Sequence, residues 1–552
     1  MSGSHATDSH NQPPLLEDCN TYLLDQVVQD AVAREGAATA HAELEAVGAW
    51  CGSAEALLAA RQANAAPPQL RAYDAAGRRL DRVEFHPAYH TLMRESAAVG
   101  LQGRLWEHLG VNATRPQGAY VARAAALYLT AGLDCGHLCP LSMTSAAVPA
   151  LKSSPDLLKT WLPRIITRAY DPRHRPAAAK SGITLGMAIT ERQGGSDVNV
   201  LATRAEPAAS VGEGACLLKG HKWFVAAPMS DGFLILAEAA GGLTAVLVPR
   251  LLPDGQANGL HLLRLKDTLG NRANATAEIA LHDTIGWRIG EAGRGVSILM
   301  EMVTETRLDC AIASAGLMRA ALAEAVHFTR HRRVRGERLI GLPLMRHVLA
   351  DLALDVEAAV AVVFRLARAF DRVTDQRAAA WRRLMTPVVK YWTTKVAPAF
   401  IAEAMECLGG NGYVEDSRLP RLYREAPVNA IWDGAGNVMG LDVLRVLKRH
   451  PETAEIVIDD LRTLSGDDPL LKQALVRVED LLHEPRELDL RARTLAEQLA
   501  HLSAAVVLRA HAPGVVADAF ITTRLAGAFR QTYGQGLEGQ DTSAILARVL
   551  PE

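Results

Sequence analysis

The segment AITERQGGSDV, residues 188–198, carries the sharpest chemical signal of the sequence. Thr190 and Ser196 offer hydroxyl groups, and Gly194 with Gly195 lets backbone N–H groups approach a ligand closely. Such a loop can hold a phosphate or the edge of a flavin, although a glycine-rich turn between strands explains the spacing equally well. No GxGxxG motif of the dinucleotide type and no GKS or GKT phosphate loop follows a strand here, which disfavours NAD binding and nucleotide hydrolysis.

Two further segments suit a planar or a phosphorylated cofactor. In GHKWFVA, residues 220–226, Trp223 could stack on a planar ring, but a tryptophan in a strand more often belongs to the core. In FTRHRRVRGERL, residues 328–339, several guanidinium groups in a loop between helices suit a pyrophosphate, although a solvated surface explains them as well. These arginines are Arg330, Arg332, Arg333, Arg335 and Arg338.

An acidic residue with catalytic potential lies in the second of two glycine turns, GGNGY at 409–413 and DGAGN at 433–437. Asp433 stands between Trp432 and Gly434, and beside flat apolar surface it could act as a base near neutral pH. The alternative is a helix N-cap aspartate.

The elements that position these groups follow from hydrophobic spacing and from the abundance of Ala and Leu with only 5% aromatic residues, which favours packed helices. Short apolar runs with Gly, Asp, Asn and Pro between them predict a β domain of about six strands. Long helical blocks at 293–331, 343–373, 378–408 and 437–449 suit an antiparallel bundle. The predicted parts are a flexible tail (1–14), a helical N-terminal domain (15–182), a β domain (183–287), a helical bundle (288–450) and a C-terminal helical domain (451–552).

Charge and composition exclude several classes of function. The 552 residues contain 59 Lys and Arg against 61 Asp and Glu, so no global basic field attracts nucleic acid or anionic membrane. No apolar stretch reaches the roughly 18 residues of a membrane span, and the polar start has no signal-peptide core. We therefore expect a cytoplasmic protein. The cluster CGHLC at 135–139 lacks a second ligand pair, so we expect no metal site.

Five segments in order, TERQGGSD, HKWF, RRVRG, GGNGY and DGAGN, resemble the motifs of the acyl-CoA dehydrogenase family. The sequence is most similar to the AidB-type branch, the alkylation-response flavoproteins, through GHLCPLSMT at 136, PLMRHVL at 343, VFRLARAF at 363 and LPRLYREAPVNAIW at 419. The resemblance covers most of the chain. It implies an α+β, mostly α fold with a helical N-terminal domain, a central β-barrel, a four-helix bundle and an extra C-terminal helical domain. It also implies FAD lodged between these domains and a homotetramer built as a dimer of dimers.

The resemblance further implies a reaction and its residues. The reaction is α,β-dehydrogenation of an acyl-CoA thioester, with Asp433 as base, hydride transfer to flavin N5, and an electron-transfer flavoprotein or oxygen as acceptor. Arg332 would hold the pyrophosphate of a neighbouring subunit's flavin. The residues implied to bind FAD are Met187, Ile189, Thr190, Gly195, Ser196, Trp223, Val225, Arg332, Gly409, Gly410, Ala435 and Asn437.

A second hypothesis is an AidB-like, FAD-containing protein of the alkylation response that binds double-stranded DNA and has weak or no dehydrogenase activity. Residues 451–552 contain ten Lys and Arg against sixteen Asp and Glu, which disfavours contacts with phosphates. A tetramer could still gather the scattered Arg491, Arg493, Arg524 and Arg530 into a groove. A third hypothesis is a flavin-binding oligomer without turnover.

Overall fold

The computed structural model describes residues 11–372, 374–483, 488–526 and 539–550. The chain divides into two compact units: unit 1 contains Met1–Ala54, Tyr120–Leu133 and Cys310–Glu552, and unit 2 contains Glu55–Ala119 and Asp134–Asp309. The architecture is α+β and mostly helical, as predicted. The first ten residues of the predicted tail lie outside the described residues. None of the described helices is long and apolar enough to cross a membrane.

Unit 2 is built around a β-barrel. Strands β6, β4, β5, β9 and β7 follow one another in hydrogen-bonding order, and β7 pairs again with β6, which closes the ring. Strand β3 pairs parallel with β6, and β8 pairs antiparallel with β9. Val225, Phe233 and Ile279 belong to the fully buried barrel core. The strands are β3 (Leu185–Ala188), β4 (Arg204–Pro207), β5 (Ala215–Ala226), β6 (Gly232–Ala239), β7 (Gly242–Pro249), β8 (Leu260–Leu265) and β9 (Thr276–Ile289).

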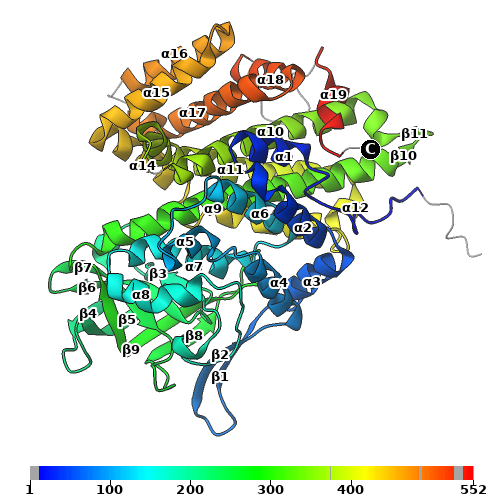
Figure 1. The fold of residues 1–552 in the computed structure, drawn as a ribbon. Helices are drawn as coiled ribbons and strands as arrows, with labels where there is room; N and C mark the ends of the chain where they lie inside the picture. Colours follow the sequence, from blue (N-terminus) through cyan, green and yellow to red (C-terminus); the bar gives the residue numbers. More distant parts are fainter. Residues whose placement is uncertain (1–10, 373, 484–487, 527–538, 551–552) are drawn as a thin grey trace, which may run out of the picture. The chain divides into compact units, whose positions relative to one another are not determined.

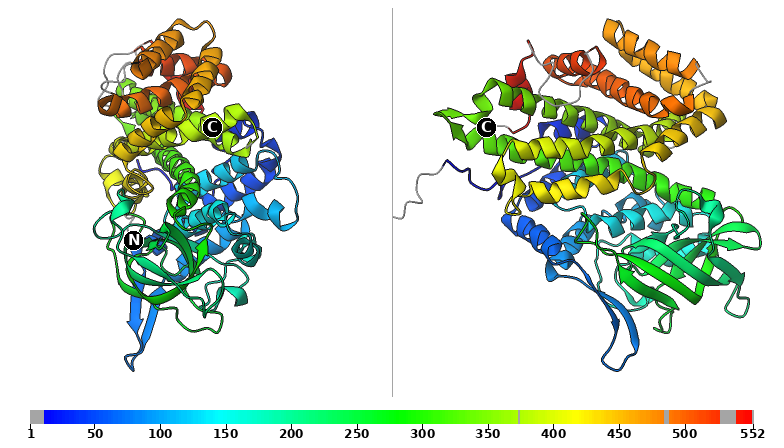
Figure 2. Two further views of the ribbon diagram at one scale, coloured as in Figure 1. Left: turned by 90° about the vertical axis from the view of Figure 1, so that its left-hand side faces the viewer. Right: turned by 180° about the vertical axis from the view of Figure 1, so that it is seen from behind.

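A hairpin of β1 (Gln69–Tyr73) and β2 (Arg79–Glu84) extends from unit 2 (Figure 2). The helical structure predicted throughout residues 15–182 is wrong for this hairpin. Asp74 Oδ1 accepts from the backbone N–H groups of Ala76 and Arg78 at 2.8 and 2.9 Å, and Gly77 has φ +77°, so this local turn reverses the chain. The helices of unit 2 are α3 (Ala54–Ala65), α4 (Pro87–Ala98), α5 (Glu107–Gly110), α7 (Leu138–Leu151) and α8 (Pro155–Ile165).

Unit 1 consists of helices and one short hairpin (Figure 1). Helix α9 (Gly295–His331) contributes residues to both units. The other helices of unit 1 are α1 (Gln26–Arg34), α2 (His41–Cys51), α6 (Ala119–Leu133), α10 (Pro343–Asp371), α11 (Gln376–Glu406), α12 (Gly410–Tyr413), α13 (Leu419–Asn429), α14 (Gly436–Arg449), α15 (Pro451–Ser465), α16 (Pro469–His483), α17 (Leu488–His511), α18 (Gly514–Phe520) and α19 (Thr542–Ala547). The hairpin consists of β10 (Arg333–Val334) and β11 (Glu337–Arg338).

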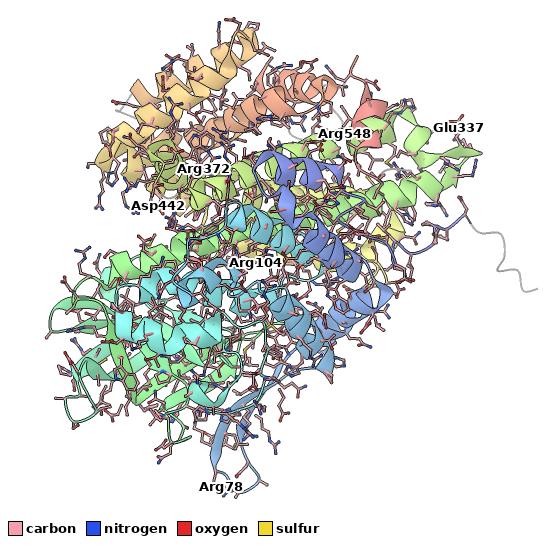
Figure 3. All side chains as sticks on the ribbon, viewed as in Figure 1. Arg78, Arg104, Glu337, Arg372, Asp442 and Arg548 are labelled. Carbon is pink, nitrogen blue, oxygen red and sulfur yellow. The ribbon has the colours of Figure 1, made fainter. Side chains whose placement is uncertain are left out.

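The C-terminal helices are packed onto α10, α11 and α14 of the same unit. A buried ion pair fixes them: Arg524, in the π-helical turn after α18, lies 2.6 Å from Asp351 and 2.8 Å from Asp355 of α10. Arg548, labelled in Figure 3, donates at 2.5 Å to Glu357 of α10. Charged side chains of this region are therefore used to join helices of the chain itself.

Candidate active site

The loop that follows β3 in unit 2 is anchored by a buried ion pair. Glu191 Oε1 accepts from Lys222 Nζ of β5 at 2.7 Å, and both side chains are fully buried. Glu191 also accepts from the backbone N–H groups of Ala202 at 2.7 Å and Thr203 at 3.1 Å. Burial opposes ionisation, but the hydrogen bonds from Lys222 and Thr203 outweigh it and lower the pKa of Glu191 to about 2. The ionised carboxylate of Glu191 therefore anchors the loop to β5.

Thr190 and Gly195 are in close contact within this loop. A Cβ atom on Gly195 would lie 2.8 Å from Thr190 Oγ1, so a larger residue would displace the threonine. The backbone N–H of Trp223 donates to Thr190 O at 2.9 Å, which joins β5 to the loop. Thus Thr190, Gly195 and Trp223 come together, and Ser196 is exposed beside them.

The indole of Trp223 is half-buried rather than part of the core. Lys266 Nζ lies 3.5 Å from the ring centroid, and the Arg192 and Arg264 guanidinium groups lie 5.0 and 5.8 Å from it, so three cations contact the aromatic ring. A planar ligand that stacks here shares the ring with them. Val225 differs, since its side chain lies in the barrel core and only its backbone is left for a ligand. Met187 and Ile189 are half-buried.

In unit 1, a lysine of α11 holds the backbone of the turn that carries Asp433. Lys390 Nζ of α11 donates to Trp432 O at 2.7 Å and to Gly434 O at 2.6 Å, the carbonyls on either side of Asp433. Asp433 has φ +56°, a left-handed conformation that is uncommon outside glycine. The Cys310 thiol donates to Asp433 Oδ2 at 3.7 Å. The carboxylate is therefore half-buried in a turn with a fixed backbone.

Asp433 is not the N-cap of the following helix. Helix α14 begins at Gly436, and Ala435 occupies the N-cap position without a side-chain hydrogen bond. A Cβ atom on Gly436 would lie 2.8 Å from Lys395 Cε, so this helix start is tightly packed on α11. Ala435 and Asn437 are both exposed at the start of α14.

The arginine-rich segment forms the β10–β11 hairpin. Arg335 and Gly336 at its tip have φ +52° and +86°, the pair of positive values that a type I′ turn requires. Arg332 is half-buried, and its Nη1 donates to Asn11 O at 2.6 Å. Asn11 also bonds the backbone of Arg333 twice, accepting from its N–H and donating to its carbonyl, each at 2.6 Å. The N-terminal segment therefore lies on the arginine turn.

Gly409 and Gly410 leave open space at the start of α12. Gly409 has φ +59°, and a Cβ atom on either glycine would meet no atom within 4 Å. Asn411 of the same helix donates to Gln12 Oε1 at 3.0 Å, so the segment that contacts Arg332 also contacts α12. The structure thus brings the arginine turn and the glycine turn of unit 1 to one segment.

His137 of the CGHLC motif is a buried structural residue. Its Nδ1 lies 2.7 Å from Asp134 Oδ2 and its Nε2 lies 2.8 Å from Ser96 Oγ. Asn64 Nδ2 donates to the other oxygen of Asp134 at 2.7 Å. Both ring nitrogens of His137 are therefore engaged within the protein.

Three family models match most of the chain up to residue 448. Residues 11–172 match the N-terminal domain of the adaptive response protein AidB, residues 186–284 the acyl-CoA dehydrogenase middle domain, and residues 293–448 the acyl-CoA dehydrogenase C-terminal domain. The acyl-CoA dehydrogenase-like protein AidB of Escherichia coli (strain K12) is 45% identical over 478 residues, which cover 86% of this chain and 87% of that protein. The chain belongs to the acyl-CoA dehydrogenase family.

Further relatives agree with this family. Acyl-CoA dehydrogenase family member 11 of Caenorhabditis elegans is 32% identical over 79% of this chain and 72% of its own. The crystal structure of Caenorhabditis elegans ACDH-11 in complex with C11-CoA has a TM-score of 0.86 and 27% identity, covering 98% of this chain and 96% of that one. The family fold, with an N-terminal helical domain, a central β-barrel and C-terminal helices, is thereby confirmed.

Sequence reasoning missed the residues that hold the loop after β3 in unit 2 and the Asp433 turn in unit 1 in shape. Glu191 and Lys222 lie in the family motifs TERQGGSD and HKWF, but their spacing in the sequence does not indicate an ion pair. Lys390 is 43 positions before Asp433 on another helix, and Lys266 reaches Trp223 from the end of β8. The contacts of these four residues depend on tertiary structure alone.

Proposed function

We propose that this protein is an FAD-dependent acyl-CoA dehydrogenase that oxidises the α,β-bond of an acyl-CoA thioester, with Asp433 as base. The observation that carries the proposal is the Asp433 turn, where Lys390 donates to both flanking carbonyls at 2.7 and 2.6 Å. The resemblance to the family assigns the catalytic acid to this position. A carboxylate in a fixed turn can take a proton without reorganising its surroundings.

The residues present are compatible with FAD. Thr190 and Ser196 offer hydroxyls at the end of β3, Trp223 offers part of an aromatic face, and Gly409 with Gly410 offers open backbone. We propose that these groups bind the cofactor, together with Met187, Ile189, Val225, Ala435 and Asn437. Arg332 would serve the pyrophosphate of a neighbouring subunit, so the proposal includes a homotetramer.

The proposed chemistry divides one oxidation between the chain and its cofactor. Asp433 accepts the proton from the α-carbon, next to the thioester carbonyl. When bound, FAD supplies at N5 the acceptor for the hydride that leaves the β-carbon. The product is the α,β-unsaturated thioester, and the two electrons pass to an electron-transfer flavoprotein or to oxygen.

Anaerobic titration of the purified yellow protein with a panel of acyl-CoA thioesters tests the proposal. We expect bleaching of the flavin absorbance with at least one thioester, and an Asp433→Asn variant that keeps its flavin should bleach at least 100-fold more slowly, as the loss of a general base predicts. Asp416→Asn, which changes an exposed aspartate before α13, is the matched control. Equal bleaching rates in the parent and Asp433→Asn would overturn the base assignment.

The DNA-binding alternative has less support. Of the arginines that a groove would need, Arg524 is buried in its ion pair with Asp351 and Asp355, and Arg493 donates to the Tyr391 hydroxyl at 3.0 Å. Arg530 lies outside the described residues. Retention on duplex DNA that falls with salt, without bleaching by any thioester, would favour this alternative instead.

A further inference from the structure

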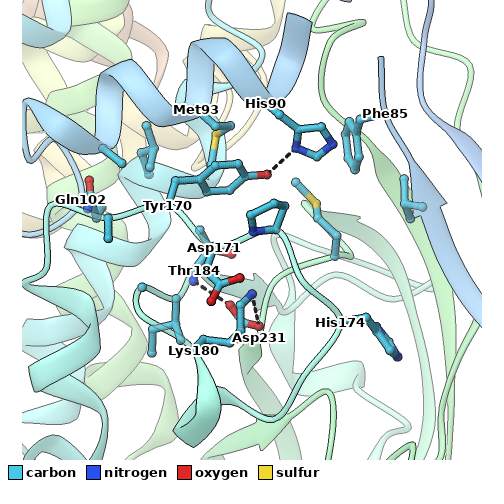
Figure 4. A pocket seen from close by; sticks show the side chains of 18 of the residues that line it. Phe85, His90, Met93, Gln102, Tyr170, Asp171, His174, Lys180, Thr184 and Asp231 are labelled. Carbon is cyan, nitrogen blue, oxygen red and sulfur yellow. Dashed lines mark hydrogen bonds and ion pairs between the residues drawn. The ribbon is translucent and has the colours of Figure 1, made fainter. Parts of the chain in front are cut away.

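Unit 2 contains a cavity of about 320 Å³ next to α4 (Figure 4). Among the described residues, neither the loop 189–196 nor Trp223 lines it, so it is a separate feature from the proposed flavin residues. Its volume lies at the lower end of small-molecule sites. At about 30 Å³ per water molecule in the liquid, it has the volume of roughly ten waters. The apolar part of the wall includes Phe85, Met93, Ala97, Leu141, Ile183 and Met229.

One part of the wall presents hydrogen-bond donors in excess. Lys180 is buried, and within the described part of the chain its ammonium donates only to Asp231 Oδ1, at 2.8 Å, although it carries three donors. Arg250 donates to His174 Nδ1 at 3.0 Å, and its Nε is buried without a partner. Arg82 lines the mouth, and no hydrogen bond of its side chain to a described residue exists.

His174 adds no negative charge that would balance the donors of Lys180 and Arg250. A guanidinium can only donate, so His174 Nδ1 accepts from Arg250 and the ring is neutral. Burial, followed by the positive charges of Arg250, Arg82 and Lys180, lowers the pKa of His174 to about 4. His174 therefore supplies no negative charge to the donors at this end of the cavity.

Arginines that do not line the cavity already neutralise part of the charge of the carboxylates that do. Glu84 lies 3.4 Å from Arg71, and Asp171 lies 2.5 Å from Arg173, and neither arginine lines the cavity. Asp231 and, at longer range, Asp171 balance part of the positive charge of the wall. The wall itself has three cations against three carboxylates, and the outside arginines Arg71 and Arg173 turn this balance positive, so the unfilled donors favour an anionic ligand.

A buried acceptor without a partner among the described residues lies elsewhere in the wall. Gln102 is 3% exposed, its Nε2 donates to Thr167 O at 2.6 Å, and its Oε1 is buried without a partner. Figure 4 shows Gln102 and His174 on opposite sides of the cavity. A buried acceptor without a donor is costly, so the ligand is expected to bring a hydroxyl to Gln102.

We propose that this cavity binds a small hydroxy-carboxylate of about ten heavy atoms, with its carboxylate on Lys180 and Arg250, its carbon chain on the apolar wall, and its hydroxyl on Gln102. An inorganic anion would leave the apolar wall unfilled. A neutral molecule would leave the donors of Lys180 and Arg250 without acceptors. The site is independent of the proposed dehydrogenase reaction.

Isothermal titration calorimetry on the full-length protein tests the proposal with three probes: 8-hydroxyoctanoate, octanoate and octan-1-ol. We expect 8-hydroxyoctanoate to bind about tenfold more tightly than octanoate, and octanoate more tightly than octan-1-ol, because each step removes one polar group that the cavity matches. Saturating octanoyl-CoA should leave the affinity unchanged, which separates this cavity from the acyl-CoA site.

Variants assign the binding to the cavity. Arg250→Met should weaken both acids about tenfold without affecting octan-1-ol, and Gln102→Leu should abolish the difference between 8-hydroxyoctanoate and octanoate. If Arg250→Met does not fold, the exposed Arg82→Met variant takes its place with the same expected direction. Arg78→Met, at the far tip of the β1–β2 hairpin, is the matched control and should bind like the parent (Figure 3).

Several results would overturn the proposal. They are an absence of binding by both acids at millimolar concentration, undiminished binding in Arg250→Met and Arg82→Met, or octan-1-ol that binds as tightly as octanoate. A crystal structure with 8-hydroxyoctanoate that shows only ordered water in the cavity would also overturn it.

Discussion

The ammonium group of Lys390 lies 2.6 Å from the carbonyl oxygen of Gly434, in a helix that is distant in sequence from this turn. The same nitrogen bonds Trp432 O, so the backbone on both sides of Asp433 is held by one buried charge. Lys390 acts as a positioning residue for the proposed base.

Replacement of this lysine should separate positioning from binding. In Lys390→Met we expect kcat to fall roughly 10- to 100-fold, because a displacement of about 1 Å costs that much, while KM changes less than about threefold. Stopped-flow reduction, normalised to bound flavin, measures both. Lys448→Met, an exposed lysine of α14, is the control. A rise of KM by roughly 10- to 100-fold, with kcat unchanged, would contradict the positioning role.

The Glu191–Lys222 pair predicts a specific acid sensitivity. The folded pKa of Glu191, about 2, lies below the unfolded value, so its contribution to stability is full above about pH 4.5 and is lost as pH falls toward 2. The loss amounts to about 3 kcal/mol. Urea unfolding at pH 6 and pH 3 should show a smaller pH effect in Glu191→Gln than in the parent. Glu206→Gln on exposed β4 should retain the parental dependence; a Glu191→Gln variant with that same dependence would refute the assignment.

His137 predicts a stability effect without a catalytic one. Replacement by Phe keeps the volume but removes both side-chain hydrogen bonds, to Asp134 and to Ser96, and should lower the free energy of unfolding by about 2–4 kcal/mol. Ser96→Ala removes one partner and should cost about 1 kcal/mol. Urea titration with flavin bleaching as a second readout checks both numbers. Loss of bleaching in a folded, flavin-loaded His137→Phe variant would show that the network does more than stabilise unit 2.

Arg524 predicts that the C-terminal helices depend on a buried charge. Arg524→Met removes the Arg524 cation from the buried carboxylates of Asp351 and Asp355 and should cost about 3–5 kcal/mol, measured by thermal unfolding and by proteolysis of the C-terminal region. Arg462→Met, which removes an exposed pair with Glu479, should cost less than about 1 kcal/mol. Similar costs for the two variants would contradict the role of burial.

Long periodic helices were predictable to within a few residues because the pattern and its punctuation agree. The block 343–373 corresponds to α10, Pro343–Asp371, which begins with Pro at its first position, as helix starts favour. The β1–β2 hairpin was missed because its strands are short and polar, with only a local aspartate turn to mark them. The four residues of β4 were missed for the same reason.

The candidate site was predictable where glycines and motif letters mark the chain, and not where distant side chains complete it. The spacing in 188–198 identified the loop, whereas its anchor to Lys222 depends on how the barrel closes. Of the two hypotheses for Asp433, the structure excludes the helix N-cap, because Ala435 occupies that position two residues later. The role of Asp433 as base stays a prediction.

The contact of Asn11 with Arg333 has a consequence for self-association. Exposed strand edges recruit further strands and lead to aggregation. At the edge of the β10–β11 hairpin, the Asn11 amide occupies both the N–H and the carbonyl of Arg333, as an adjoining strand would. One polar side chain near the start of the chain thereby blocks this edge against the addition of a foreign strand.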